Sequence, residues 1–87
     1  MHTGRNEVER IVIKIVRDIE ELPDDRVILS TTDFRADLGT DSLFDAEFGM
    51  AVEERFEIEV PDSARPKTIG EAVDMILAAQ AATSCGA

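Results

Sequence analysis

Apolar residues near the start of the chain recur at steps of three and four, the spacing of one face of an α-helix. The stripe consists of Val8, Ile11, Val12, Ile15 and Ile19, widened by Ile13 and Val16. Pro23 follows the stripe, and proline stops helices. We therefore predict a helix over about residues 5–21.

The periodic pattern disappears over residues 22–40, which are rich in the turn-forming residues Pro, Asp, Ser, Thr and Gly. Loops of this length are uncommon in compact domains and are often functional. The scattered apolar residues of this segment are Ile28, Leu29, Phe34 and Leu38. We expect these four residues to pin a long loop onto the core.

A second helical pattern follows the loop and holds to about Phe56. Asp41 is suited to begin this helix, because an Asp side chain accepts hydrogen bonds from the free N–H groups of a first turn. One apolar line consists of Phe48, Val52 and Phe56, and a second, rotated line consists of Leu43, Ala46 and Met50. Acidic residues flank the second line, and exposed apolar residues rimmed by acids are typical of a protein-binding face.

The last helix is predicted to begin at about Ile69. Thr68 and Glu71 have the spacing of a capping box, in which the two side chains cap the first helical turn. The expected buried face consists of Ile69, Val73, Ile76 and Leu77, with Ala72 and Met75 on its flanks. We expect this helix to fray near Gln80.

These patterns predict an all-α fold, a small variant of the four-helix bundle with three main helices and one short helical turn between the second and third. No alternating run is long enough to predict a strand. A chain of 87 residues organises only one hydrophobic core. We therefore expect a single domain over residues 1–87, with an ordered core over about 5–80 and a frayed tail over 81–87.

The formal net charge of −10 is concentrated in one part of the chain. Residues 36–62 contain nine acidic residues and a single basic one, Arg55. Such a field repels nucleic acid and anionic membranes, and it attracts basic protein surfaces. The charge therefore favours a protein partner, although a merely solvated acidic face would have the same composition.

Other sequence features limit the protein's chemistry and location. Cys85 is the only cysteine, which excludes an internal disulfide, and we expect an incidental exposed thiol. His2 stands alone near the start and predicts no metal site. The sequence shows no signal peptide and no stretch approaching the roughly 20 apolar residues of a membrane span. We therefore expect a cytosolic protein without a metal or a membrane anchor.

The segment with the most specific pattern covers residues 37–43, Asp-Leu-Gly-Thr-Asp-Ser-Leu. Gly39 permits a tight turn, after which Ser42 lies in the first turn of a helix. A hydroxyl group at this position is expected to be exposed. The positive end of the helix, with its free N–H groups, suits a phosphate attached there.

This segment resembles the phosphopantetheine attachment site of acyl carrier proteins, whose hallmark is Asp-Ser-Leu preceded by Asp-Leu-Gly. Ile58, Val60, Pro61 and Asp62 also match the family's exit from its second helix, and the likeness covers roughly residues 8–80. It implies a 4′-phosphopantetheine arm from coenzyme A on Ser42, flanked by Asp41 and Leu43. It also implies a non-catalytic carrier of acyl thioesters for fatty-acid, polyketide or related lipid biosynthesis.

The same resemblance implies particular partners. They are a phosphopantetheinyl transferase and enzymes of the acyltransferase and ketosynthase type with basic docking surfaces. The residues expected at the docking face are Phe44, Asp45, Ala46, Glu47, Met50, Glu53 and Glu54. Complexes formed through rim charges should be weak and sensitive to salt. We expect a monomer that binds no nucleic acid.

Three departures from the family pattern indicate a specialised carrier. Phe44 occupies a position that is usually acidic, and we expect its ring to be exposed on the docking face. Gly49 replaces a branched apolar residue, and we hypothesise that it reshapes the acyl cavity, although a neutral change is an equal alternative. The segment 61–69 is short and contains Pro66, so the family's short third helix should be reduced to a turn.

Two other functions stay open at this point. An aminoacyl or peptidyl carrier would use the same arm and the same serine, and an unmodified acidic interaction module would need neither. A calcium loop beginning at Asp33 fails, because Leu38 and Phe44 stand where calcium loops need Gly and Glu. An enzyme is disfavoured, because no His or Cys lies near Ser42 in the sequence to activate a nucleophile.

Overall fold

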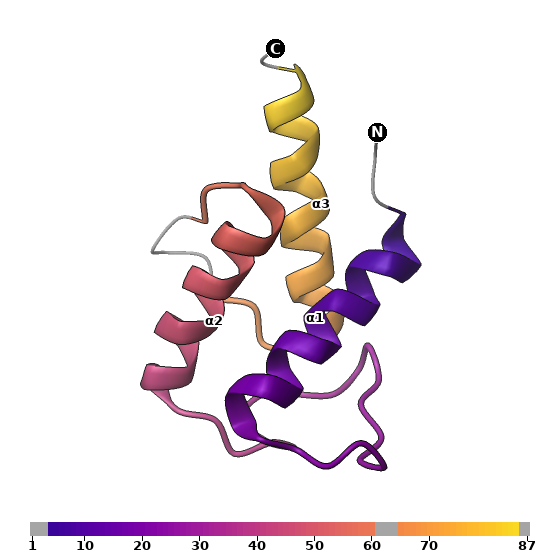
Figure 1. Ribbon diagram of the computed structural model, residues 1–87, viewed down its shortest axis with the longest axis vertical. Helices are drawn as coiled ribbons and strands as arrows, with labels where there is room; N and C mark the ends of the chain where they lie inside the picture. The colour runs from indigo at the N-terminus through magenta and orange to yellow at the C-terminus, as the bar shows by residue number, and fades with distance from the viewer. Residues whose placement is uncertain (1–3, 61–64, 86–87) are drawn as a thin grey trace.

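The computed structural model describes residues 4–60 and 65–85 as a bundle of three helices. The helices are α1 (Arg5–Glu20), α2 (Ser42–Phe56) and α3 (Ile69–Cys85). Figure 1 shows α2 at the left and α1 at the right, with the lower part of α3 passing behind α1. Within the described ranges the only β-type pairing is an isolated antiparallel bridge between Asp33 and Thr68. The predicted all-α fold is confirmed.

The helix α1 forms and ends close to the predicted positions. Val8, Val12 and Val16 are its buried residues, and their four-residue spacing gives the helix one core-facing stripe. The helix ends at Glu20, because Glu21 adopts a left-handed conformation with φ 51° and donates its N–H to the Arg17 carbonyl. The chain thus leaves the helix before Pro23 is reached.

The core lies where the three helices face one another. Its fully buried members are Val8, Val12, Val16, Val52, Ile69, Ala72, Val73 and Ile76. The predicted helix faces therefore contain the residues that the fold buries, including Ala72, which the pattern had placed on a flank. Burying such side chains stabilises the fold by roughly 25 cal/mol per Å² of apolar surface.

The loop between α1 and α2 is held against the rest of the molecule by hydrogen bonds and by two buried side chains. Ile28 and Phe34 enter the core, as predicted. Leu29 does not: its side chain is 58% exposed, so the expectation that it pins the loop is wrong. Arg17 Nη2 donates to the Arg26 carbonyl at 2.7 Å and thereby ties the loop to α1.

The loop is also joined to the start of α3. Phe34 N–H donates to the Lys67 carbonyl at 2.9 Å, and Gly70 N–H donates to the Ser30 carbonyl at 2.8 Å. A Cβ atom at Gly70 would lie 3.1 Å from that Ser30 oxygen, so glycine permits the close approach. These contacts fix the segment that leads to α2 relative to α3.

The predicted cap of α3 is present in a modified form. Thr68 Oγ1 accepts a hydrogen bond from Glu71 N–H at 3.2 Å, as a capping box requires. Glu71 Oε1, however, accepts from Lys67 N–H at 3.4 Å, one residue before the cap. Both groups nevertheless satisfy donors at the start of the helix.

The end of α3 differs from the prediction. The helix continues to Cys85 rather than fraying near Gln80, so the expected frayed tail over 81–87 is wrong as far as residue 85. Alanine has the highest helix propensity, and the alanine-rich segment 78–82 carries the helix past its last core residues. The prediction failed because it followed core contacts and neglected this propensity.

The predicted short turn between α2 and α3 falls partly on residues 61–64, which lie outside the described residues. Residues 65–67, which are described, form no helix. Within the described ranges, no helix is long and apolar enough to cross a lipid bilayer.

Candidate functional site

The chain reaches α2 through a tight turn built by residues 33–40. Asp33 Oδ1 accepts hydrogen bonds from the N–H groups of Arg35 at 2.9 Å and Ala36 at 2.8 Å. Gly39 adopts φ +66°, a left-handed conformation that costs glycine little. Thr40 N–H then donates to the Phe34 carbonyl at 3.1 Å. This turn holds the residues before α2 in one conformation.

Asp41 begins α2 as predicted. Its backbone is extended, and its Oδ1 accepts a hydrogen bond from Phe44 N–H at 3.1 Å. Such caps stabilise a helix by about 1 kcal/mol. The cap places Ser42 at the first helical position, where the residue is exposed. The predicted exposure of Ser42 is confirmed.

Two free backbone donors accompany the Ser42 hydroxyl. Among the described residues, nothing accepts a hydrogen bond from the N–H groups of Ser42 and Leu43, whereas the two following N–H groups are bonded to Asp41. Free donors at a helix N-terminus, together with the helix dipole, favour a negatively charged group. The residues present therefore fit a phosphodiester attached to the Ser42 oxygen.

Thr40, two positions earlier, is unsuited to the same role. It is 8% exposed, and its hydroxyl oxygen is buried without a hydrogen-bond partner among the described residues. Arg35 Nη1 donates to the Thr40 carbonyl at 3.1 Å and holds this residue in place. The two neighbouring hydroxyl groups thus differ sharply in accessibility.

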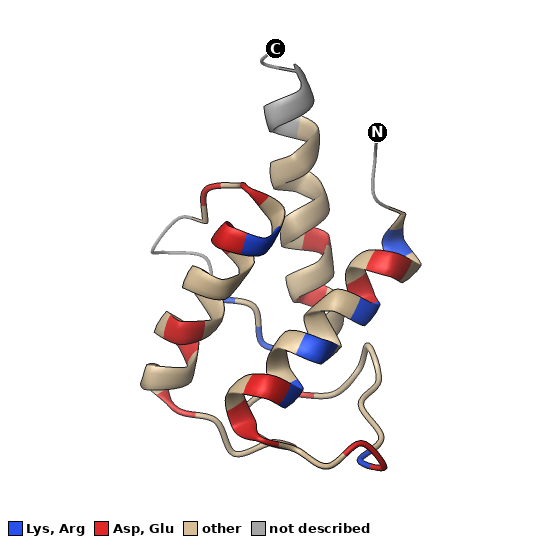
Figure 2. Cartoon of the chain, viewed as in Figure 1, with Lys and Arg blue, Asp and Glu red and all other residues tan. Residues whose placement is uncertain are grey.

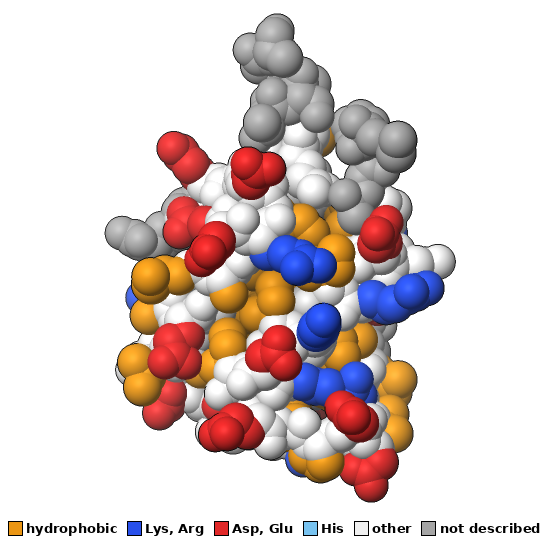
Figure 3. Space-filling view, viewed as in Figure 1, with side chains coloured by type: hydrophobic (Ala, Val, Ile, Leu, Met, Phe, Trp, Pro, Cys, Tyr) orange, Lys and Arg blue, Asp and Glu red, His pale blue; other side chains and the backbone are white. Residues whose placement is uncertain are grey.

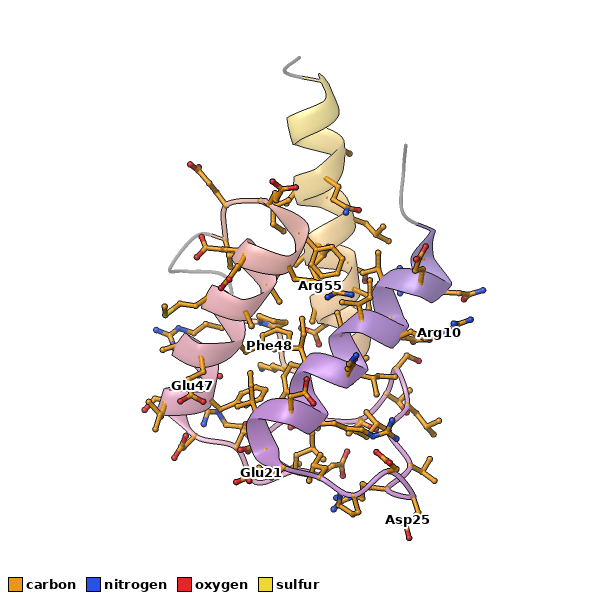
Figure 4. The ribbon with its side chains drawn as sticks, viewed as in Figure 1. Arg10, Glu21, Asp25, Glu47, Phe48 and Arg55 are labelled. Carbon is orange, nitrogen blue, oxygen red and sulfur yellow. The ribbon has the colours of Figure 1, made fainter. Side chains whose placement is uncertain are left out.

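The outer face of α2 carries exposed apolar and acidic side chains. Leu43 is 64% exposed and Met50 is 69% exposed, and Ala46 is also exposed between them. Figure 2 shows acidic residues along the same helix, and Figure 3 shows hydrophobic side chains among acidic ones at the left of the view. In Figure 4, Glu47 projects outward while Phe48 points into the bundle. This arrangement matches the predicted face, and its docking role stays a prediction.

The predicted exposure of Phe44 is wrong. Its side chain is 2% exposed and packs against Phe34 and Phe48, with ring centroids 5.3 and 5.5 Å away. Phe44 and Phe48 are four residues apart, so they share the inner face of α2. Phe34, delivered by the loop, completes the three-ring cluster, which the α2 pattern alone did not reveal. Because its ring is buried, Phe44 is not available to a docking partner, and the prediction that it belongs to the docking face is wrong.

Two of the predicted docking acids are engaged within the molecule. Asp45 Oδ2 accepts from Arg35 Nη2 at 2.5 Å and lies 3.6 Å from Arg65 Nη1, and its side chain is 27% exposed. Glu53 Oε2 accepts from Val60 N–H at 3.0 Å. Both carboxylates hold chain segments beside α2, so they are less available to a partner than Glu47 and Glu54, which are exposed.

A small cavity of about 30 Å³ lies behind α2. Its apolar lining includes the three clustered Phe rings together with Gly49, Val60, Pro66 and Met75. A Cβ atom at Gly49 would meet no atom within 4 Å, so the missing side chain leaves open space there. Gly49 thus lines this cavity, and its effect on an acyl cavity stays a hypothesis.

Comparison with known proteins defines the class. The family model described as "Phosphopantetheine attachment site" matches residues 10–76, a range that contains Ser42 and all of α2. The chain therefore has the domain of proteins that bear a 4′-phosphopantetheine group. The cofactor implied by residues 37–43 is confirmed.

The similar proteins narrow this class to the acyl carrier proteins. A putative mitochondrial acyl carrier protein of Schizosaccharomyces pombe is 34% identical over 84% of this chain and 67% of its own length. The mitochondrial acyl carrier proteins of Neurospora crassa and Saccharomyces cerevisiae are each 35% identical, over 87% and 84% of this chain. This chain covers 58% and 62% of those two relatives. It belongs to the acyl carrier protein family.

The same relatives contradict the predicted cytosolic location, because all three are named mitochondrial proteins. The prediction rested on the absence of an apolar leader. Targeting signals are recognised by receptors, and the composition of a folded domain does not reveal the compartment in which the protein resides.

Proposed function

We propose that Ser42 bears the 4′-phosphopantetheine arm and that the chain carries acyl groups as thioesters between enzymes of fatty-acid or related lipid biosynthesis. The observation that carries the proposal is the exposed Ser42 hydroxyl at the first position of α2, beside two free backbone N–H groups. The names of the similar proteins support an acyl cargo.

Attachment requires a transferase and coenzyme A. The Ser42 oxygen forms a new bond to the phosphorus that bears the pantetheine, and the bond from that phosphorus to the bridging oxygen of the nucleotide breaks. Adenosine 3′,5′-bisphosphate leaves, and the Ser42 proton passes to a base on the transferase. The preceding residue, Asp41, uses its Oδ1 to cap the helix through Phe44 N–H, and we assign activation of the Ser42 hydroxyl to the partner enzyme.

When bound, the arm supplies a thiol that carries the acyl group as a thioester. The protein's own residues present this group rather than react with it. The turn over residues 33–40 and the Asp41 cap hold Ser42 at the surface, and tethering raises the concentration of the cargo at any docked enzyme. This arrangement describes a carrier, not a catalyst.

The docking surface consists of the exposed residues of α2. Leu43, Ala46 and Met50 supply an apolar centre, and Glu47 and Glu54 supply charge for Lys and Arg patches on a partner. Exposed rim charges mainly increase the rate of encounter, and salt screens them. The complexes are therefore short-lived, as a shuttle between enzymes requires.

Intact-protein mass tests the attachment directly. Wild-type chain incubated with coenzyme A and a broad-specificity phosphopantetheinyl transferase should gain one phosphopantetheinyl group. The Ser42→Ala variant should gain none, whereas Ser30→Ala, which removes another exposed serine hydroxyl, should be modified like wild type. An unchanged wild-type mass, or modification of Ser42→Ala, would refute the proposal.

A further inference from the structure

Three basic side chains gather beside the first turns of α2, in the most acidic part of the molecule. Residues 36–62 contain only Arg55 as a base. Arg35, Arg65 and Lys67 come from the segments on either side of that range, and together they line one pocket next to α2. The fold thus places three cations where the sequence shows a net charge of −8.

The backbone fixes this gathering. Phe34 N–H donates to the Lys67 carbonyl at 2.9 Å, and Asp33 and Thr68 form the isolated antiparallel bridge. These contacts join the segment before α2 to the segment before α3. The Lys67 carbonyl is itself paired and Arg35 directly follows the paired Phe34, so the backbones of these two residues are held near each other.

The pocket has a volume of about 340 Å³. Besides the three cations it is lined by Asp33, Asp45, Phe34 and Pro66. Phe34, Asp45 and Arg65 also line the smaller cavity behind α2, so the two spaces adjoin. The pocket therefore has a polar mouth next to an apolar interior.

The two acids of the pocket are already engaged. Asp33 Oδ1 accepts from two backbone N–H groups, and Asp45 Oδ2 pairs with Arg35 and lies 3.6 Å from Arg65. Lys67 is exposed and forms no ion pair within residues 4–60 and 65–85. Among the residues that line the pocket, three cations face two acids, and Lys67 is the cation without an acid partner among them.

The pocket lies close to the attachment point. Asp45 follows Ser42 by three residues, which is about 4.5 Å along the helix axis, and residues at this spacing are neighbours on the helix surface. Since Asp45 lines the pocket, the pocket lies about one helical turn from Ser42. A group tethered to Ser42 can therefore reach it.

We propose that this pocket binds an anionic group at the far end of the acyl cargo, the free carboxylate of a dicarboxylic acid monothioester. Arg65 and Lys67 would hold the carboxylate, and Phe34 would contact the carbon chain. The inference rests on the proposed attachment at Ser42. Elsewhere along α2 an anionic cargo meets acidic residues, so this pocket is the place near Ser42 where its charge is favourable.

The test compares two cargoes of four carbons. Wild-type chain is loaded with butyryl or succinyl pantetheine from the corresponding coenzyme A thioesters, and intact mass verifies the loading. If neither thioester loads, the attachment at Ser42 is refuted, and the pocket is then tested by itself: the unmodified chain should bind free succinate more tightly than free butyrate. If the pocket binds no carboxylate, the succinyl group should stabilise the protein less than the butyryl group does, because its negative charge is repelled by a protein of net charge −10. If the pocket binds the carboxylate, we expect the Tm of the succinyl form to be roughly 2–4 °C higher than that of the butyryl form at low salt. This difference in Tm is called the margin below.

Variants assign the effect to the pocket. Lys67→Gln and Arg65→Gln should each abolish the margin between the succinyl and butyryl forms. Arg10→Gln removes an exposed cation of α1 that does not line the pocket (Figure 4) and should leave the margin intact. A margin of zero or of opposite sign in wild type, or one that survives Lys67→Gln, would overturn the proposal.

The phosphodiester of the arm is a second source of negative charge, and it is present with either cargo. If Lys67→Gln lowers the Tm of the unloaded arm-bearing form while the margin between cargoes is zero, the pocket serves the phosphodiester and the proposal is wrong. Equal effects of Lys67→Gln on the butyryl and succinyl forms would contradict it as well.

Discussion

At the scale of single residues, the site depends on small differences in position. Thr40 and Ser42 both carry a hydroxyl, but Thr40 is buried by the turn and Ser42 begins the helix in solvent. The sequence predicted this exposure, because the Asp41 cap fixes where the helix starts. It did not predict the two Arg side chains on Asp45, since they lie ten and twenty residues away and meet it only in the folded chain.

Gly49 provides a prediction at this scale. It lies inside α2, where glycine is less favourable than alanine by roughly 0.5–1 kcal/mol, and the space for a Cβ atom is open. Gly49→Ala should therefore raise the free energy of unfolding by about that amount, measured by urea denaturation. A loss of stability would show that the space beside Gly49 is not open.

At the scale of the elements, the helices were more predictable than their surroundings. The starts of α2 and α3 carry side-chain caps, Asp41 and Thr68, and both were predicted from sequence. The end of α3 has no comparable signal, so its extension to Cys85 was missed. The three-ring cluster was missed because it needs Phe34 from a loop that has no periodic pattern.

The cluster predicts unequal effects at two adjacent positions of α2. Phe44→Ala removes a buried ring and should lower the free energy of unfolding by about 3–5 kcal/mol. Leu43→Ala truncates a side chain that is 64% exposed, and it should change that energy by about 0.5 kcal/mol or less. Urea denaturation of both variants checks the contrast. Similar losses at the two positions would contradict the burial of Phe44.

At the scale of the whole molecule, the charge is divided between the helices. Acidic side chains follow the outer face of α2, whereas both basic and acidic residues are distributed along α1 (Figure 2). The sequence predicted this division from the counts of residues 36–62, since net charge needs no knowledge of contacts. It did not reveal the basic pocket within the acidic region, because the pocket is assembled from both flanks.

The acidic face predicts a charge-dependent encounter with the transferase. Glu47→Lys should lower the kcat/KM for modification by roughly 3–10-fold at low salt, and the loss should shrink at about 0.5 M salt. Asp18→Lys makes the same charge change at an exposed position of α1 and should have a much smaller effect. Equal losses in the two variants would mean that net charge, rather than the α2 face, guides docking.

The central claim is that the arm is attached to one particular hydroxyl. Trypsin cleaves after Arg35 and Arg55 and releases a peptide over 36–55, whose only hydroxyl side chains are Thr40 and Ser42. Fragment masses of this peptide, taken from the modified protein, identify the residue that bears the phosphopantetheine. We predict that Ser42 alone carries the group; a modified Thr40, or an unmodified peptide from a protein of increased mass, would contradict the account.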